Sequence, residues 1–442
     1  MGTITVAIPF TGKSHFPSTL RQFTESPLVE KVYVVHDGGY KGGDMKCEGI
    51  LSSSFTNGRT VGQILANTVT DHLLIVTRSD AIELGQGALE RFVTIATETS
   101  AGMVYSDYQE ISDGKRTGHP LLDYQFGSVR DNFDFGFLLF LSCKPVRYAV
   151  TKYGAPADVR WAGLYDLRLK ISIDAGIFHL QEFLYSTPAY DERTSGEKLF
   201  DYVDPRNRDV QKEMEVVFTQ FLKDAGAYLA PGFNHVPASR EPFPVEASVV
   251  IPVRNRERTI GDAVESALGQ KTDFAFNVIV VENHSTDATG NVIGRMHNKD
   301  KRVVCLVPER RDLGIGGCWN EAVFSDHCGR FAVQLDSDDL YSSNGTLQRV
   351  VDEFRSNDYG MVIGSYKLVN FELQEIPPGI IDHREWTDDN GRNNALRVNG
   401  LGAPRAFRTE VAREIRFPNV SYGEDYAVAL AVSRKYRIGR IY

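Results

Sequence analysis

The sequence of 442 residues has few of the features that mark secreted, membrane-spanning or nucleic-acid-binding proteins. Its five cysteines are scattered without CxxC spacing, which indicates reduced thiols rather than a disulfide framework or a zinc site. No apolar run approaches the roughly 18 residues that a transmembrane helix needs. The chain does not open with a basic segment and an apolar core, so no signal peptide is expected. The net charge of −9 argues against a nucleic-acid or anionic-membrane surface. We therefore expect a cytoplasmic protein, with peripheral attachment at the inner face of the membrane left open.

The composition is that of a soluble globular protein, with 42% hydrophobic and 24% charged residues. The length predicts two or three domains. Residues 205–226 predict a helix with a proline near its first turn. Residues 231–247 contain four prolines, which indicates an extended connector. We therefore expect one domain over residues 1–230, a linker over 231–247 and a second domain over 248–442.

The two halves carry the same order of features. Each opens with a short apolar strand that ends in proline, Thr5–Pro9 in the first half and Ser248–Pro252 in the second. Amphipathic stretches and further apolar strands alternate after both. Strands that alternate with helices predict mainly parallel sheets flanked by helices. The expected fold is α/β, with two domains of similar plan.

Residues 11–14, Thr-Gly-Lys-Ser, follow the first strand and look like the end of a phosphate-binding loop. Such a loop needs a glycine five residues before its Gly-Lys pair, and that position is Ala7. Val253-Arg254-Asn255-Arg256 stands at the corresponding place in the second half and has no glycine. We interpret both stretches as turns between a strand and a helix, and we do not expect an ATP or GTP site.

Polar clusters in the second half follow expected parallel strands, at the edge where open α/β sheets bind ligands. The first cluster joins Pro252-Val253-Arg254-Asn255 with Glu282-Asn283. Side chains at neighbouring strand ends can hold a flat nucleobase, and an amide such as Asn283 both donates and accepts, which suits a pyrimidine edge. Ordinary turn formation is the open alternative.

Two further clusters are acidic. Leu335-Asp336-Ser337-Asp338-Asp339 places three carboxylates within four residues, and their repulsion calls for a cation such as Mg²⁺ or Mn²⁺. Glu424 and Asp425 stand at the start of an expected helix, where a carboxylate can act as a general base. Helix capping is the alternative for both clusters. Arg310, beside Arg311, is placed either to meet diphosphate oxygens or to remain solvated.

Together and in this order, the clusters over about residues 246–442 resemble the family 2 glycosyltransferases with the GT-A fold. The matching positions are the strand Val249–Pro252, the Ser285-Thr286-Asp287 stretch, the aspartate motif Asp336–Asp339 and the base motif Glu424-Asp425. The resemblance implies a nucleotide-diphosphate sugar donor, with a UDP-sugar favoured, a divalent metal, inversion at the anomeric carbon and a saccharide or lipid-linked acceptor. It assigns the metal mainly to Asp338, nucleoside contact or support of the metal to Asp336, and proton acceptance to Asp425, with Glu424 next in line.

The chain also departs from the family pattern. Asn283 replaces an acid, and Arg254 replaces a frequent aromatic residue, which leaves the nucleobase open. The sequence ends at Tyr442, where relatives usually continue, so part of the acceptor side is expected to be missing.

The first half resembles the same family weakly. It has Arg78 opposite Asp336 in our alignment and Gly163-Leu164 opposite Glu424-Asp425. We expect no metal-dependent transfer there, but a scaffold, a docking surface or an acceptor-binding module. The main hypothesis is glycosyl transfer in the synthesis of a cell-surface polysaccharide or glycoconjugate. The rivals are a nucleotide-sugar-binding pseudoenzyme or scaffold, and a sugar nucleotidyltransferase.

Overall fold

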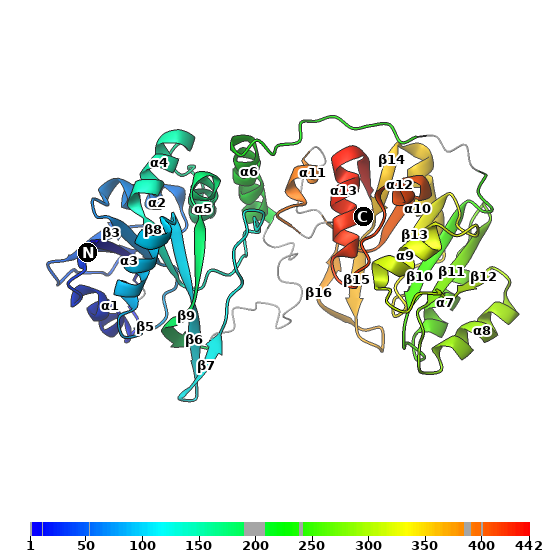
Figure 1. The fold of residues 1–442 in the computed structure, drawn as a ribbon, viewed down its shortest axis with the longest axis horizontal. Coiled ribbons are helices and arrows are strands. Elements are labelled where there is room, and N and C mark those ends of the chain that lie inside the picture. Colours follow the sequence, from blue (N-terminus) through cyan, green and yellow to red (C-terminus); the bar gives the residue numbers. More distant parts are fainter. Residues whose placement is uncertain are drawn as a thin grey trace. The chain divides into compact units, whose positions relative to one another are not determined.

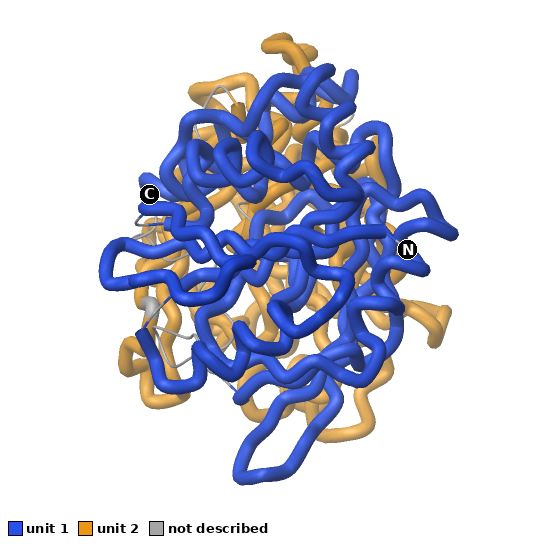
Figure 2. The backbone as a smooth tube through the Cα atoms, turned by 90° about the vertical axis from the view of Figure 1, so that its left-hand side faces the viewer, with its two compact units in different colours: residues 1–194, 206–228 blue, residues 195–205, 229–442 orange. Residues whose placement is uncertain are grey.

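The computed structural model divides the chain into two compact units (Figures 1 and 2). The first takes in the described residues up to Ala189 together with 208–228, and the second those from Leu229 onward. The residues that the structure describes are 2–10, 12–52, 54–189, 208–237, 242–383, 390–398 and 401–442.

Unit 1 is built on a nine-stranded sheet with the strand order β3-β2-β1-β4-β8-β6-β9-β5, and β7 pairs with β6. Its strands are β1 (Ile4–Pro9), β2 (Val29–His36), β3 (Cys47–Leu51), β4 (His72–Val76), β5 (Glu83–Leu84), β6 (Met103–Ser112), β7 (Lys115–His119), β8 (Leu138–Ser142) and β9 (Ile177–Pro188). Its helices are α1 (Phe16–Thr24), α2 (Gly58–Asn67), α3 (Ala88–Thr99), α4 (Cys143–Tyr153), α5 (Gly163–Asp174) and α6 (Arg208–Asp224). The helix expected over 205–226 is thus α6, and Pro205 lies outside the described residues.

Unit 2 is built on a seven-stranded sheet with the order β12-β11-β10-β13-β17-β14-β18, and β15 and β16 form a separate two-stranded sheet. Its strands are β10 (Ala247–Val253), β11 (Phe276–Glu282), β12 (Val303–Leu306), β13 (Phe331–Gln334), β14 (Tyr359–Ile363), β15 (Tyr366–Val369), β16 (Glu375–Ile381), β17 (Arg405–Arg408) and β18 (Arg437–Arg440). Its helices are α7 (Ile260–Leu268), α8 (Thr289–Lys299), α9 (Ile315–Val323), α10 (Thr346–Ser356), α11 (Gly391–Asn394), α12 (Thr409–Ile415) and α13 (Glu424–Lys435).

Seven strands have the same order and direction in the two units. The order of strands across the sheet, β3-β2-β1-β4-β8-β6-β9 in unit 1, corresponds to β12-β11-β10-β13-β17-β14-β18 in unit 2. β8 and β17 run antiparallel to both of their neighbours, and the other pairs along this path are parallel. The expected α/β fold with two mainly parallel sheets is confirmed, and the shared seven-strand path contains one reversed strand in each unit that the sequence did not reveal.

Helices cover both faces of the unit 2 sheet. Successive side chains of a strand point to opposite faces, so neighbouring residues of β10 contact different helices. Val249 and Ile251 of β10 pack in one core with residues of α7, α8 and α10. Val250 of the same strand packs in another core with residues of α9, α12 and α13. Both cores are apolar and buried, which explains why β10 and β11 read as continuous apolar runs in the sequence.

The pairing register aligns the two units residue by residue. β1 begins at Ile4 and β10 at Ala247, which places Pro9 at the position of Pro252. The registers β1–β4 and β10–β13 then place Ile75 at the position of Gln334. Beyond the strands, this register places Thr77 at the position of Asp336. The expectation that Arg78 stands opposite Asp336 is therefore wrong by one residue, because two short apolar strands can be aligned by sequence in more than one register.

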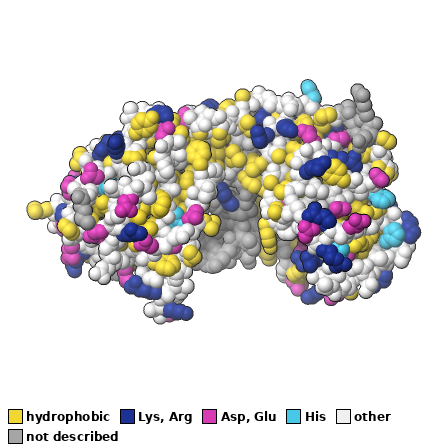
Figure 3. Space-filling model, viewed as in Figure 1, with side chains coloured by type: hydrophobic (Ala, Val, Ile, Leu, Met, Phe, Trp, Pro, Cys, Tyr) yellow, Lys and Arg dark blue, Asp and Glu magenta, His cyan; other side chains and the backbone are white. Residues whose placement is uncertain are grey.

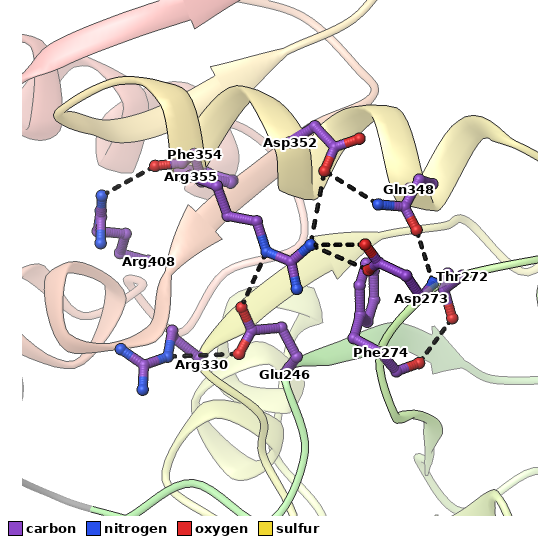
Figure 4. Close-up of polar contacts among 10 residues, drawn as sticks. All are labelled: Glu246, Thr272, Asp273, Phe274, Arg330, Gln348, Asp352, Phe354, Arg355 and Arg408. Atoms are coloured by element: carbon purple, nitrogen blue, oxygen red, sulfur yellow. Dashed lines mark hydrogen bonds and ion pairs between the residues drawn. The ribbon is translucent and has the colours of Figure 1, made fainter.

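The edge of the unit 2 sheet where β10 and β13 begin is held by an ion network (Figure 4). Arg355 of α10 pairs with Glu246 at 3.3 Å and with Asp273 at 2.9 Å, and Glu246 also pairs with Arg330 at 3.5 Å. Arg408 at the end of β17 donates from Nη2 to the carbonyl of Phe354 (Figure 4). These contacts lie at the opposite strand ends from the polar clusters singled out in the sequence.

The face shown in Figure 3 carries basic and acidic side chains interspersed over each unit. In the part of the chain that the structure describes, no helix is both long and apolar enough to cross a membrane.

Candidate active site

A cavity of about 320 Å³ opens in unit 2 at the edge where β10 and β13 end and α13 begins. Of the residues singled out in the sequence, five line it: Pro252, Asp336, Asp338, Glu424 and Asp425. Segments up to 173 residues apart in the chain thus meet at one site, from Pro252 at the end of β10 to Asp425 in α13. This convergence is what the carboxyl edge of a parallel sheet provides.

The aspartate motif occupies the turn after β13. Asp336 accepts a hydrogen bond from Nε2 of Gln334 at 2.9 Å. The side chain of Asp338 is half-exposed, and its Oδ2 lies 3.5 Å from Nε of Arg256. Asp336 is therefore held against the protein, and Asp338 faces solvent beside the half-exposed guanidinium of Arg256.

Burial and mutual repulsion raise the pKa values of several of these acids. Burial raises the pKa of Asp336, and the negative charges of Asp338 and Asp425 raise it further. The hydrogen bond from Gln334 and the positive charge of Arg405 act in the opposite direction and lower it. Burial, together with the charges of Asp336 and Asp338, raises the pKa of Asp339 to about 6. An acidic cluster of this kind, which Arg256 and Arg405 balance only in part, favours a bound cation, because a cation lowers the energy of all the ionised forms together.

The base motif starts α13. Gly423 precedes it with φ 78°, a left-handed conformation that glycine adopts without strain. The Glu424 side chain is buried, its Oε2 has no hydrogen-bond partner among the described residues, and burial raises its pKa. Asp425 is more accessible, and its Oδ2 forms an ion pair with Nη1 of Arg405 at 2.8 Å. Of the two acids, Asp425 is the one whose carboxylate is both oriented and open to the cavity.

Apart from Pro252, the nucleobase cluster lies outside the set of cavity-lining residues, and so does Arg310. Glu282 and Asn283 are buried at the end of β11. Nδ2 of Asn283 donates to the carbonyl of Leu313 at 2.8 Å, which leaves its Oδ1 without a partner among the described residues. Arg254 is exposed, and Arg310 forms a bidentate pair with Asp312 at 2.7 and 3.0 Å. The structure therefore brings the acidic clusters together but does not bring these four residues to the same cavity.

Sequence reasoning missed two groups at the site. The first is Arg405, at the start of β17 and only 7% exposed, together with Gln334. The second is the glycine cluster Gly314, Gly316 and Gly317 around the start of α9. A Cβ on Gly316 would lie 2.0 Å from the carbonyl oxygen of Pro418, so glycine allows the segment before α13 to approach α9 closely. Three glycines within four residues were the available signal for this approach. Arg405 gave none, because its strand was not expected.

Residues 248–416 match the family model described as Glycosyl transferase family 2. These residues are a family 2 glycosyltransferase domain. They contain the aspartate motif and Arg405, and the base motif at Glu424 lies shortly after the end of the matched segment at residue 416. The expected resemblance is confirmed for this part of the chain, and the general activity of the family is transfer of a glycosyl group. The family model does not extend to unit 1, so its status as a degenerate glycosyltransferase repeat stays a prediction.

Named relatives match part of this chain. Glycosyltransferase AglD of Haloferax volcanii is 33% identical over 133 residues, which are 29% of this chain and 21% of the relative. The poly(ribitol-phosphate) beta-glucosyltransferase of Bacillus spizizenii is 26% identical over 187 residues, 41% of this chain and 28% of the relative. The structure of S. aureus TarS 1–349 with UDP-GlcNAc covers 44% of this chain and 55% of its own, at 23% identity and a TM-score of 0.36. The chain thus spans about a quarter of the length of the first curated relatives that it matches.

Proposed function

We propose that the family 2 domain transfers a sugar from a nucleotide-diphosphate sugar to an acceptor hydroxyl, with a divalent cation and with inversion at the anomeric carbon. The observation that carries this proposal is the single cavity that collects Asp336, Asp338 and Asp425 from the end of β13 and the start of α13. A donor diphosphate and an acceptor hydroxyl need these two kinds of carboxylate on opposite sides of one reaction centre.

Asp338, with Asp336 in support, is the residue that would hold Mg²⁺ or Mn²⁺. Among the described residues, no cluster of three or more His, Cys, Asp or Glu side chains forms a complete metal cage. That donor set fits a cation that takes one or two carboxylates from the protein and completes its shell with substrate phosphates and water. When bound, such a cation offsets the negative charge of the departing nucleotide diphosphate.

The nucleoside would lie against the ends of β10 and β11. Pro252 supplies an apolar surface at the cavity. Oδ1 of Asn283 has no partner among the described residues but is buried, and it would have to become accessible to accept a hydrogen bond from the ring N–H of uracil. This acceptor favours a UDP-sugar. Arg254, whose guanidinium can stack on a base, and Glu282 remain candidates for nucleoside contacts. Arg310 would have to leave Asp312 to reach a phosphate.

Asp425 would accept the proton of the acceptor hydroxyl as the hydroxyl oxygen attacks the anomeric carbon. A direct attack with one base inverts that carbon, because the new bond forms on the face opposite to the leaving diphosphate. Glu424 is the alternative base, and its unpartnered Oε2 is the observation in its favour.

A saccharide or lipid-linked acceptor, used at the cytoplasmic face of the membrane in cell-surface synthesis, is the acceptor class that we propose. Support comes from the names of two relatives. One is the poly(ribitol-phosphate) beta-glucosyltransferase. The other, from Escherichia coli, is the UDP-Glc:alpha-D-GlcNAc-diphosphoundecaprenol beta-1,3-glucosyltransferase WfgD, 29% identical over 123 residues.

The test uses the full chain and a donor panel of UDP-glucose, UDP-N-acetylglucosamine, UDP-galactose and GDP-mannose, with Mn²⁺ and release of nucleoside diphosphate as the readout. Asp338→Ala should abolish Mn²⁺-dependent binding of UDP in calorimetry, whereas Asp425→Asn should keep binding and lose at least about 100-fold in transfer. Asp273→Ala, at the opposite strand ends, is the matched control and should keep both. Unchanged binding by Asp338→Ala would refute the metal assignment. Binding without turnover by the wild type would instead favour the pseudoenzyme.

A further inference from the structure

A chain of polar contacts under the cavity connects the aspartate motif to the base motif. Nε2 of Gln334 donates to Oδ1 of Asp336 at 2.9 Å, and Oε1 of Gln334 accepts from Nη1 of Arg405 at 3.3 Å. The same Nη1 lies 2.8 Å from Oδ2 of Asp425. Nε of Arg405 donates to the carbonyl of Leu401 at 2.7 Å, which anchors the guanidinium from behind. Two residues thus join the carboxylates assigned to the donor side and to the acceptor side.

The chemistry of the four groups sets the direction of this chain. An ionised carboxylate only accepts hydrogen bonds, and a guanidinium only donates them. An amide between the two satisfies both in one orientation only, with its nitrogen toward Asp336 and its oxygen toward Arg405. Because Gln334 and Arg405 are both buried, breaking either contact leaves a polar group without water to replace its partner. These contacts therefore fix the positions of the Asp336 and Asp425 carboxylates relative to each other.

Unit 1 shows that the fold does not need these contacts. The register places Ile75 at the position of Gln334, and Leu139, which pairs with Ile75, at the position of Arg405. Thr77 replaces Asp336, and the α5 start puts Leu164 at the position of Asp425. The two carboxylates, the amide and the guanidinium are thus absent together from a sheet with the same strand order. A set of contacts that is absent as a whole from a second sheet of the same topology belongs to the chemistry of the site.

We propose that Arg405, held in place by Gln334, is a positioning residue for transfer: it fixes the Asp425 carboxylate relative to Asp336, so that the proton acceptor and the donor site stay in register. This inference rests on the proposed function. Arg405 affects transfer only by positioning the Asp425 carboxylate. A displacement of about 1 Å in a reacting group can cost on the order of 100-fold in rate, which is the scale of the effect that a lost anchor produces.

The variants that test this are Arg405→Met, Arg405→Lys and Gln334→Ile, with the donor of the panel that the wild type uses fastest. Arg405→Met should lower kcat by about 100-fold and leave the donor KM within about threefold, because the donor contacts are untouched. Arg405→Lys keeps a cation but not the planar fork, and should recover part of the loss. Gln334→Ile introduces the residue that unit 1 has at this position, and should lower kcat by about tenfold with the fold intact.

Arg408→Met is the matched control. Arg408 lies on the same strand, and its guanidinium also donates to backbone carbonyls, those of Tyr359 and Phe354, but at the opposite strand end. This variant should lose stability and keep kcat. A double variant separates positioning from folding: Arg405→Met added to Asp425→Asn should change kcat by less than about twofold, because the group that Arg405 positions is already inactive.

The outcomes are distinct. Wild-type kcat in Arg405→Met, or equal losses of kcat in Arg405→Met and Arg408→Met, would overturn the inference alone. A further large loss in the double variant would also overturn it, because Arg405 would then act independently of Asp425. Lack of turnover by the wild type with every donor would overturn the proposed function, and the inference would fall with it.

Discussion

Gly316 should be intolerant of even one added methyl group. Its Cα lies in the first turn of α9, and a Cβ there would stand 2.0 Å from the Pro418 carbonyl oxygen and 3.0 Å from Cβ of Glu424. A backbone carbonyl cannot rotate away as a flexible side chain can. The segment before α13 and helix α9 must therefore separate by about 1 Å in a Gly316→Ala variant.

The expected cost follows from two opposing effects. Alanine favours a helix over glycine by about 0.8–1 kcal/mol in a helix interior, and by less in a first turn. Overpacking of a close contact costs about 1–3 kcal/mol. The net loss in the free energy of unfolding should be about 1–2 kcal/mol, from the difference of the two effects. Transfer should also slow, because Trp319 of α9 and Asp425 line the same cavity.

Gly294→Ala is the matched control for this prediction. Gly294 is an exposed position inside α8, and a Cβ there would meet nothing within 4 Å. That variant should gain about 0.8–1 kcal/mol. Urea denaturation followed by circular dichroism measures both free energies. Equal stability of the two variants would refute the packing argument, because the contact with the Pro418 carbonyl is what should make Gly316→Ala the less stable of the two.

Three further predictions concern regions away from the cavity. Asp80, held by Lys13 at 3.0 Å and Arg78 at 2.8 Å, already has cations of its own, so Asp80→Ala should leave the rate of transfer unchanged, and a large loss would show that unit 1 takes part in catalysis. Arg355→Ala should cost about 1 kcal/mol in denaturation, since its ion pairs are partly exposed, and should keep kcat; a loss of kcat would tie the network of Figure 4 to the site. Burial lowers the pKa of His72 below its ordinary value of 6.5, so the folded state keeps it neutral while the unfolded chain takes up a proton. The free energy of unfolding should therefore fall as the pH drops below about 6.5, and His72→Phe, which introduces the residue at the equivalent position of β13, should reduce that fall; equal slopes for both proteins would contradict it.

Much of the fold could be predicted from local patterns. Val249–Ile251 and Val278–Val281 are continuous apolar runs, and each lies in the buried middle of a parallel sheet where both faces need apolar side chains. Polar residues directly after such runs must reach the ligand edge, so the acidic clusters could be placed without coordinates. The helix that begins at Glu424 was equally predictable, because apolar residues follow it at helical spacing.

The features that could not be predicted from the sequence depend on contacts between distant segments of the chain. β17 is four residues long and has arginine at both ends, so nothing in its own sequence identifies a central strand. Arg405 could not be recognised until β17 was placed beside β13. The register between the units required the same information, and this explains the error at Arg78. Arg310 was singled out by its place between two motifs, and its ion pair with Asp312 became apparent only in the structure.

The reversed direction of β17 bears on how such a site can change over evolution. In an all-parallel sheet, only the loops that follow strands reach the ligand edge, and loops shift when their sequence changes. A reversed strand instead brings its own first residue to that edge, on a backbone that hydrogen bonds hold from both sides. The equivalent position of unit 1 carries Leu139 where unit 2 carries Arg405, and both sheets keep the same order. A single substitution at this position can therefore add or remove a charge at the ligand edge while the surrounding frame stays in place.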